Sequence, residues 1–455
     1  MVNLPQGPKR VYVVTGVIMG DNKGLMEIDG YVESVRANFP CRICKAPFDS
    51  IQIMLEEVAA LMRTPLNYEE DVLANNMTKT GIKEKCIFTA LPAFEMPTDV
   101  SVDIFHDLHE GVAHYTMLSV LRHFHKVDRT FIETLNLRMY MFDYGIDSDN
   151  KPVSISVDRL TCDKLKLTGA EMFVFVKLFG VFMGDRVDEG DDFWQLYLLL
   201  RDIMTLCCCK DLPKDARHVL AVKVKDHNAL YRELTKDTLK QKHHNLCHYS
   251  TLMKRIGLLA DFSTIRCEGK HKVLKATANV CSSRVNLALT IAIKQQLALC
   301  YRITCNQSIL ASKLLIGTGS FISLEDLSVY PVLKNILPKE IVRESEYVFV
   351  PKWVEYKGSV YKPKMVLLTG FNPELGDPIF SEIDFLLVHK DQPLFVCSLL
   401  DTLGWYTHVR GFKVEKSENE RPYCVVADAL YDPLPLGIYE MRSGEKIVVT
   451  RYFYY

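Results

Sequence analysis

The chain has 455 residues, of which 48% are hydrophobic and 24% are charged, an ordinary composition for a globular protein. This length predicts two or three domains. The 55 Lys and Arg residues nearly balance the 56 Asp and Glu residues, and the formal charge of -1 excludes a polycation that binds nucleic acid through its global charge.

The first predicted element is a buried strand. Residues 10–20 (RVYVVTGVIMG) form a run of β-branched and apolar residues that ends at Gly20. Residues 21–35 (DNKGLMEIDGYVESV) then predict a turn and a helix. We therefore expect Asp21 at the carboxyl end of a strand.

From about residue 50 to about residue 300 the pattern is mainly helical. Apolar residues recur at intervals of three and four in five segments: 50–64, 111–127, 170–184, 191–206 and 282–303. After about residue 340, short alternating segments are separated by Gly, Pro and Asn-Pro. This change predicts a separate β-rich domain that folds independently of the rest.

The cysteines and the absence of apolar spans indicate the compartment. The 14 cysteines include CCC at 207–209 and are not spaced as a disulfide framework, which favours reduced thiols. The first twenty residues lack the pattern of a signal peptide, and no stretch reaches the roughly 18 uncharged apolar residues of a membrane span. We expect a soluble nuclear or cytoplasmic protein that is not secreted and has no membrane partner.

Two short motifs carry residue types that bind zinc. FPCRICKAPFD places Cys41 and Cys44 in a CxxC turn, and KHHNLCHYS places His244 and His248 on one face of a helix. Together they make a Cys2His2 set, although 200 residues separate the two halves. A lone CxxC turn and an ordinary helix surface are the alternatives. If the cysteines lie far from the histidines, His243 and His271 are the next candidate ligands.

A basic run surrounds the second motif. Between Lys236 and Lys275 the chain has nine Lys or Arg residues and three acids, an excess of six positive charges. Such a run is either a solvated surface or a patch that binds nucleic acid.

Seven segments in order resemble the transposases of CACTA (En/Spm-type) DNA transposons from animals. They are IMGDNKGL, PCRICKAP, VDIFHDLHEGV, DDFWQLYLLLRDI, HHNLCHYSTLMKRIGLLADF, IRCEGKHKVLKATAN and SSRVNLALTIAIKQQLALCYRI. They cover about residues 10 to 305 and contain a CxxC, a DxxH, an HxxxH and a late Glu in the order of that family. The C-terminal region also resembles the tail of those elements.

The resemblance implies a fold of the α/β plus β class. It is a partial RNase H-like core with a large helical insertion, followed by a small β-rich C-terminal domain. The implied divisions are a remnant strand and helix of the core (1–40), a mainly helical insertion with the zinc motif (41–260), the helices with the catalytic Glu (261–305), a linker (306–340) and the β-rich domain (341–455).

The resemblance also implies roles for single residues. Cys41, Cys44, His244 and His248 share one structural zinc ion. Asp21 corresponds to the second catalytic aspartate, Asp103 and His106 to the DxxH, and Glu268 to the final glutamate of a site that holds Mg²⁺. Asp103 competes with Asp21 for the second acidic position, and a capped helix start is the simpler explanation of Asp103 and His106. The implied DNA-binding residues are Lys254, Arg255, Lys270, His271 and Lys272.

A DDE site cuts DNA with two metal ions held by carboxylate oxygens. Its first aspartate lies upstream of the strand that leads to Asp21, and residues 1–20 contain no Asp or Glu. We therefore expect a catalytically incomplete, transposon-derived protein that retains zinc and DNA binding, with homo-oligomerisation left open. One alternative is the C-terminal part of an active cut-and-paste transposase whose upstream exons are missing. Another is an unrelated soluble metalloprotein with a hydrolytic site at Asp103, His106 and His109.

Overall fold

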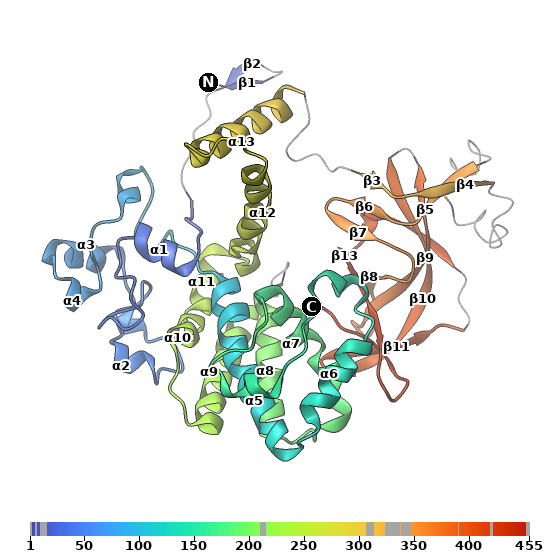
Figure 1. Ribbon diagram of the computed structural model, residues 1–455, viewed down its shortest axis with the longest axis horizontal. Coiled ribbons are helices and arrows are strands. Elements are labelled where there is room, and N and C mark those ends of the chain that lie inside the picture. The colour runs from blue at the N-terminus through green and yellow to red at the C-terminus, as the bar shows by residue number, and fades with distance from the viewer. Residues whose placement is uncertain are drawn as a thin grey trace.

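The computed structural model of the chain combines a helical body with a β-sheet region at the C-terminal end (Figure 1). It describes residues 2–4, 7–9, 16–209, 215–305, 314–323, 337, 347–389, 391–418 and 422–451. Among the helices in these ranges, none has the length and the apolar character that crossing a membrane requires.

The described part of the predicted first strand, residues 16–20, forms a single β-bridge and no longer strand. Residues 10–15 of that strand lie outside the described residues, and Ile18 makes a single parallel bridge to Val100. Strands β1 (Val2–Leu4) and β2 (Gly7–Lys9) form a small sheet of their own. Asp21 therefore follows a bridge and begins α1 (Asn22–Ile28), where its side chain accepts a hydrogen bond from Gly24 N.

Thirteen α-helices and one π-helix lie in the described ranges. They are α1, α2 (Phe48–Ile51), α3 (Pro65–Ala74), α4 (Met77–Thr80), the π-helix η3 (Phe105–Val112), α5 (Ala113–Val127), α6 (Phe131–Met141), α7 (Gly169–Met183), α8 (Asp192–Cys207), α9 (Ala216–Thr235), α10 (Gln241–Cys247), α11 (Tyr249–Ile256), α12 (Ile265–Asn279) and α13 (Leu287–Thr304). Short 3-10 turns connect them at Ala59–Leu61, Ile87–Ala90, Gly145–Asn150, Val157–Thr161, Gly184–Arg186 and Leu259–Phe262.

Of the five helices predicted from apolar spacing between residues 50 and 303, four are confirmed, as α5, α7, α8 and α13, and the helix predicted over 50–64 is wrong. In place of a helix, its backbone pairs with the CxxC turn. Lys45 N donates to Leu61 O at 2.7 Å, and Arg63 N donates to Ile43 O at 3.0 Å. The apolar spacing of this segment therefore serves a loop that supports the cysteines.

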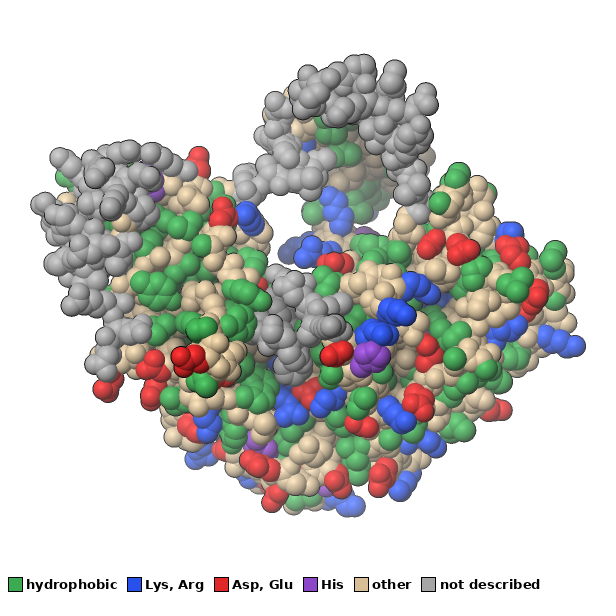
Figure 2. All heavy atoms as spheres, turned by 180° about the vertical axis from the view of Figure 1, so that it is seen from behind, with side chains coloured by type: hydrophobic (Ala, Val, Ile, Leu, Met, Phe, Trp, Pro, Cys, Tyr) green, Lys and Arg blue, Asp and Glu red, His purple; other side chains and the backbone are tan. Residues whose placement is uncertain are grey.

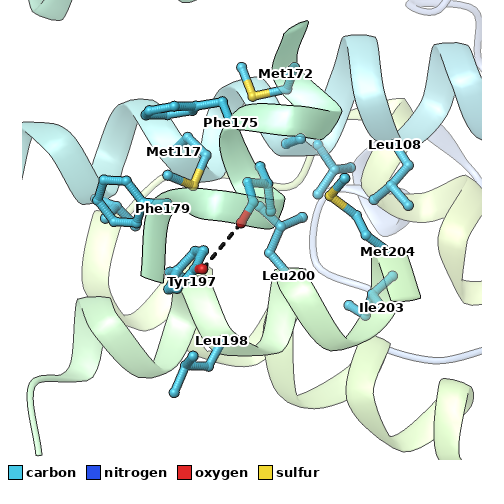
Figure 3. Packing of buried hydrophobic residues seen from close by; sticks show 14 of the residues in the cluster. Leu108, Met117, Met172, Phe175, Phe179, Tyr197, Leu198, Leu200, Ile203 and Met204 are labelled. Carbon is cyan, nitrogen blue, oxygen red and sulfur yellow. Dashed lines mark hydrogen bonds between the residues drawn. The ribbon is translucent and has the colours of Figure 1, made fainter. Parts of the chain in front are cut away.

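The core of the helical body lies between α5, α7 and α8 (Figure 3). Helix α7 begins with a capping box between Thr168 and Glu171, which satisfies backbone donors at its first turn. Trp194 and Tyr197 of α8 are fully buried, and the Tyr197 hydroxyl donates to Val176 O at 3.1 Å. In contrast, α12 and α13 have no buried residue and project from the body.

The C-terminal part is a curled antiparallel sheet. Its main path runs β13-β8-β9-β10-β11-β15-β14, with β12 beside β10 and the β4–β5 pair beside β9. The bounds are β4 (Gly319–Ser323), β5 (Tyr347–Pro351), β8 (Val366–Phe371), β9 (Pro378–His389), β10 (Gln392–Tyr406), β11 (Gly411–Lys416), β12 (Tyr423–Val426), β13 (Asp432–Leu436), β14 (Ile438–Glu440) and β15 (Lys446–Val448). A 3-10 turn at Ala427–Ala429 follows β12, and a smaller sheet contains β3 (Leu315–Ile316), β6 (Val354–Tyr356) and β7 (Ser359–Tyr361).

The sheet region begins earlier than the sequence predicts and shares a core with the helices. Strands β3 and β4 lie inside the predicted 306–340 linker. Val409, Tyr439 and Ile447 belong to the same buried cluster as α7 and α8. Across this boundary the Arg410 guanidinium donates to both carboxylate oxygens of Asp202, at 2.7 and 3.1 Å. A shared core of this kind does not favour independent folding of residues 341–455.

A candidate metal centre and the polar cluster beside it

Four buried side chains form a candidate metal centre. Cys41 and Cys44 come from the turn before α2, His244 comes from α10, and His248 lies at the junction of α10 and α11. Their ligand atoms all lie within 4.8 Å of one another, although Cys44 and His244 are 200 residues apart in the chain. The predicted meeting of the two motifs therefore occurs, and the group could hold a metal ion such as zinc.

The spacing of these atoms fits a tetrahedral ion. Metal–sulfur bonds of about 2.3 Å and metal–nitrogen bonds of about 2.05 Å give a tetrahedron with S–N edges of about 3.6 Å and N–N edges of about 3.3 Å. The observed distances are 3.6 Å from Cys41 Sγ to His248 Nε2, 3.3 Å from Cys44 Sγ to His244 Nε2, and 3.3 Å between the two Nε2 atoms. We call this group the Cys2His2 centre.

The electrostatics of the centre favour a cation. Burial raises the pKa of the Cys41 thiol, but the Cys44 thiol and the two imidazoles outweigh burial and hold the pKa well below its usual value. The hydrogen bond to Cys41, together with burial, raises the pKa of Cys44. The backbone N–H groups of Ile43 and Cys44 also donate to Cys41 Sγ, at 3.3 and 3.4 Å. A metal cation would stabilise both thiols in the deprotonated form that zinc requires.

A second layer of contacts orients the His248 ring. Its Nδ1 atom lies 2.8 Å from Glu57 Oε2, and Thr251 Oγ1 donates to Glu57 Oε1 at 2.7 Å. Burial raises the pKa of Glu57, but the hydrogen bonds from His248 and Thr251 bring it below its usual value. The Glu57 carboxylate thus accepts a hydrogen bond from His248 Nδ1–H and leaves Nε2 facing the centre of the site, as is common for zinc-binding histidines.

His243 and His271, the alternative ligands proposed from the sequence, lie outside the Cys2His2 centre. His243 is buried, faces the rings of Tyr115 and Tyr231, and accepts a hydrogen bond from Lys240 N at 3.2 Å. His271 lies on the exposed helix α12. Neither is needed to complete the Cys2His2 centre.

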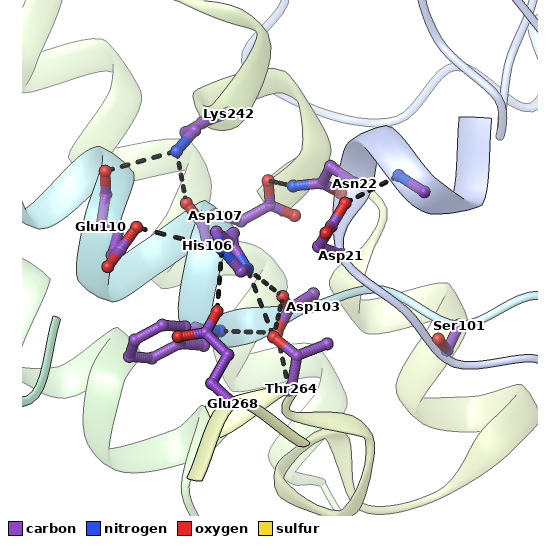
Figure 4. A network of polar contacts seen from close by, with 12 residues as sticks. Asp21, Asn22, Ser101, Asp103, His106, Asp107, Glu110, Lys242, Thr264 and Glu268 are labelled. Atoms are coloured by element: carbon purple, nitrogen blue, oxygen red, sulfur yellow. Dashed lines mark hydrogen bonds and ion pairs between the residues drawn. The ribbon is translucent and has the colours of Figure 1, made fainter. Parts of the chain in front are cut away.

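Beside this centre lies a polar cluster of Asp103, His106, Thr264 and Glu268, which we call the His106 cluster (Figure 4). His106 Nδ1 lies 2.5 Å from Asp103 Oδ2, and His106 Nε2 lies 3.3 Å from Glu268 Oε1. Thr264 and His106 are 158 residues apart in the chain. The structure therefore brings together three of the four residues expected at the catalytic site: Asp103 from the segment before η3, His106 from η3 and Glu268 from α12.

Hydrogen bonds and nearby charges shift the pKa values of Asp103 and His106 in this cluster. Burial raises the pKa of Asp103, but hydrogen bonds from His106 and Thr264 outweigh burial and lower it. The hydrogen bond with Asp103 raises the pKa of His106, and the nearby carboxylates of Glu110 and Glu268 raise it further. His106 is therefore favoured as a cation that holds Glu268 close to η3.

Asp103 uses all its hydrogen-bonding capacity inside the protein. Its Oδ1 accepts from Phe105 N at 3.0 Å and from Thr264 N at 3.1 Å, and its Oδ2 faces His106 and accepts from Thr264 Oγ1 at 2.5 Å. Asp103 is completely buried, whereas the side chains of Asp21 and Glu268 are exposed to solvent. In this arrangement Asp103 positions His106 and has no free oxygen for a metal ion.

Asp21 stands apart from the His106 cluster. Its side chain caps α1, and among the described contacts no hydrogen bond or ion pair joins it to Asp103, His106 or Glu268. It nevertheless enters the same region as the cluster (Figure 4). The neighbouring Asn22 donates to Asp107 of η3 at 2.7 Å.

His109 does not join a hydrolytic site. It is buried between the rings of Phe105 and Phe173, and its ring nitrogens have no hydrogen-bond partner among the described residues. Burial lowers the pKa of His109 to about 4. This environment favours a neutral core histidine rather than a ligand beside Asp103 and His106.

Two residues that hold η3 in place were not predicted from the sequence. The completely buried Asp107 accepts hydrogen bonds from three elements, and Lys242 Nζ donates to the carbonyl oxygens of His106 and Glu110, at 2.6 and 3.3 Å. The signal for Asp107 was its position directly after the DxxH. The signal for Lys242 was its place directly before the histidine pair.

The expected DNA-binding residues fall into two groups. Lys270, His271 and Lys272 are exposed on α12, within one turn of Glu268. Lys254 is exposed on α11, but Arg255 donates to Val100 O at 3.1 Å and so helps to fix the chain before Asp103. Lys and Arg side chains also border the hollow between the projecting helices and the sheet region (Figure 2).

No protein-family model matches the sequence, and a search of curated proteins finds no match. The resemblance to the CACTA transposases therefore stays a prediction from the order of the sequence motifs.

Proposed function

We propose that this chain is a transposon-derived protein related to the CACTA transposases, with a structural zinc ion in the Cys2His2 centre and a DNA-binding surface on α12. The observation that carries the proposal is the meeting of the CxxC and HxxxH motifs at tetrahedral spacing. Two thiolates and two imidazoles form a closed ligand set, which is typical of structural rather than catalytic zinc. Such an ion would stabilise the fold by fixing the CxxC turn against α10 and α11.

The His106 cluster supports the relation to a DDE enzyme. The DxxH residues and the late Glu of the family order lie in contact, with His106 between Asp103 and Glu268. We therefore assign Asp21, η3 and α12 to a partial RNase H-like site. Hard ions such as Mg²⁺ take carboxylate oxygens, and of the acids expected at the catalytic site the exposed Asp21 and Glu268 have oxygens available for one.

The same geometry favours DNA binding without cleavage. Phosphoryl transfer by two ions requires carboxylates that hold both ions at once. Asp103 supplies none, because its oxygens are already occupied by donors from His106, Thr264 and Phe105. Exposed Lys270 and Lys272 can still contact phosphates, with His271 beside them.

Metal content tests the zinc site. The chain purified without added metal should contain one zinc per molecule, and Cys44→Ser should lose zinc and unfold at lower temperature, because a ligand to a structural ion is removed. Cys267→Ser is the matched control, since Cys267 is an exposed cysteine on α12. Zinc content that is unchanged in Cys44→Ser, or zero in the parent chain, would contradict the proposal.

DNA binding is tested by fluorescence anisotropy with a duplex at two salt concentrations. Affinity should fall steeply as salt rises, because phosphate contacts release counterions. Lys270→Gln with Lys272→Gln should weaken binding and flatten its salt dependence. The matched control changes Lys362 and Lys364, which are exposed in the sheet region. Equal binding by both double variants would remove α12 from the proposed surface.

A further inference from the structure

Asp107 links the Cys2His2 centre to the His106 cluster. It follows His106 in η3, and its Oδ1 accepts hydrogen bonds from Asn22 at 2.7 Å and from Asn245 at 2.9 Å. Its Oδ2 accepts from the Tyr249 hydroxyl at 3.1 Å. Asn245 lies between the two histidine ligands, and Tyr249 follows the second. The buried carboxylate of Asp107, in the π-helix, is thus hydrogen-bonded to the start of α1 and to the helices that carry the histidine ligands.

Other residues of the metal-binding motifs reach the same region. Arg42, between the two cysteines, donates to Ser101 O at 2.9 Å and to Asn22 Oδ1 at 3.1 Å. Lys242, two residues before His244, donates to the carbonyl oxygens of His106 and Glu110 (Figure 4). The residues beside the ligands therefore hold the backbone around Asp103 and His106.

The element that they hold is a π-helix. A π-helix has i→i+5 hydrogen bonds, is rare, and is found most often as a short insertion at functional sites. Here η3 carries His106 in its first turn and continues into α5. External donors to its carbonyls and to Asp107 stabilise this backbone against relaxation to an ordinary α-helix.

We propose that Asp107 is a positioning residue that couples metal binding in the Cys2His2 centre to the geometry of the His106 cluster. The inference deepens the proposed function and depends on it, because an ion must occupy the centre. A bound ion fixes α10 and α11 against the CxxC turn, and this places Asn245 and Tyr249 where Asp107 accepts from them. Without the ion, those donors are free to move and η3 loses its support.

Amide hydrogen exchange by mass spectrometry on the full chain tests this coupling. In the zinc-loaded parent chain, amides of Phe105–Val112 should exchange slowly, and a chelator should speed them about tenfold or more, as expected when buried hydrogen bonds are lost. Asp107→Ala should show the fast exchange with zinc still bound. Chelation should then add little in this variant, because two changes that act through one contact are not additive.

Milder variants keep the test informative if Asp107→Ala folds poorly. Asp107→Asn keeps a carbonyl that can accept from Asn22 and Asn245, so exchange should return close to the parent rate. Tyr249→Phe removes a single donor and should give an intermediate rate, whereas the control Tyr140→Phe alters a side chain that is 89% exposed and should change nothing. The visible spectrum of Co²⁺ bound in place of zinc should be the same in all four variants, showing an intact centre.

The outcomes separate the two proposals. Slow exchange in metal-loaded Asp107→Ala, additive effects of chelation and substitution, or fast exchange in Asp107→Asn would each overturn the coupling while leaving the zinc site in place. A parent chain that binds neither zinc nor Co²⁺ would overturn the proposed zinc site and the coupling together.

Discussion

Removing the Glu57 carboxylate should weaken zinc binding without touching a ligand. Glu57 Oε2 lies 2.8 Å from His248 Nδ1, and its other oxygen accepts from Thr251 at 2.7 Å. In Glu57→Ala the buried Nδ1–H of His248 loses its acceptor, so the ring is no longer held in the orientation that directs Nε2 to the centre.

The size of the effect follows from the contacts. Removing a partner that orients a metal-binding histidine typically costs 10–100-fold in affinity, or about 1.4–2.8 kcal/mol. The hydrogen bond is short and its histidine is fully buried, so we expect at least the middle of that range, about 2 kcal/mol. The control is Glu56→Ala. Its carboxylate is 63% exposed and pairs with Lys225 at 3.0 Å, an interaction worth about 0.5 kcal/mol or less.

The assay is competition for zinc between the protein and a chromophoric chelator, with circular dichroism to show that each variant is folded. The zinc affinity of Glu57→Ala should fall about 30-fold, and that of Glu56→Ala should change by less than about threefold. Equal affinities for the two variants would refute the view that Glu57 orients His248 for a metal ion.

Three further outcomes are expected. Arg410→Ala should lower the free energy of unfolding in urea by about 2 kcal/mol, because it removes a two-point contact to the buried Asp202; a loss no larger than that of the exposed Lys416→Ala would contradict this. The free energy of unfolding should fall as the pH drops from about 6.5 toward 4. Burial lowers the pKa of three histidines to about 4 in the folded chain, so in this range their imidazoles are protonated only in the unfolded chain. A free energy of unfolding that stays constant across this range would contradict the prediction. These histidines are His109, His114 and His227. With Mg²⁺ or Mn²⁺ the chain should nick supercoiled DNA no more than Glu268→Gln does, and nicking that disappears in that variant would mean that the site is catalytically complete.

Local patterns in the sequence predicted the four helices α5, α7, α8 and α13, because the apolar spacing and the caps of these helices lie within their own segments. The segment 170–184 is apolar along its length and starts after a Thr-x-x-Glu capping box, and it forms α7. The segment 50–64 has similar apolar spacing but gives its backbone hydrogen bonds to the CxxC turn. Apolar periodicity alone does not distinguish a helix from such a loop, since the backbone partners of the loop lie outside the segment.

The metal ligands could be predicted because ligand chemistry is visible in residue types and short spacings. Ligand chemistry made a shared site one possibility, and the family resemblance favoured it, although 200 residues separate Cys44 from His244. The residues around the ligands had no such signal. Arg42 and Asn245 read as ordinary polar residues inside two motifs, and their roles depend on which carbonyl and carboxylate oxygens the fold places beside them.

Asp103 shows why a motif residue can be identified without its role. An aspartate three residues before a histidine can cap a helix, bind a metal ion or orient the histidine ring. The sequence alone is compatible with all three roles. The hydrogen bonds in the structure distinguish these roles. Four donors face the two carboxylate oxygens of Asp103, and its side chain is completely buried. The negative charge of Asp103 favours the protonated form of His106, and this cation holds the carboxylate of Glu268. The position of the exposed Glu268 side chain therefore depends on the buried Asp103.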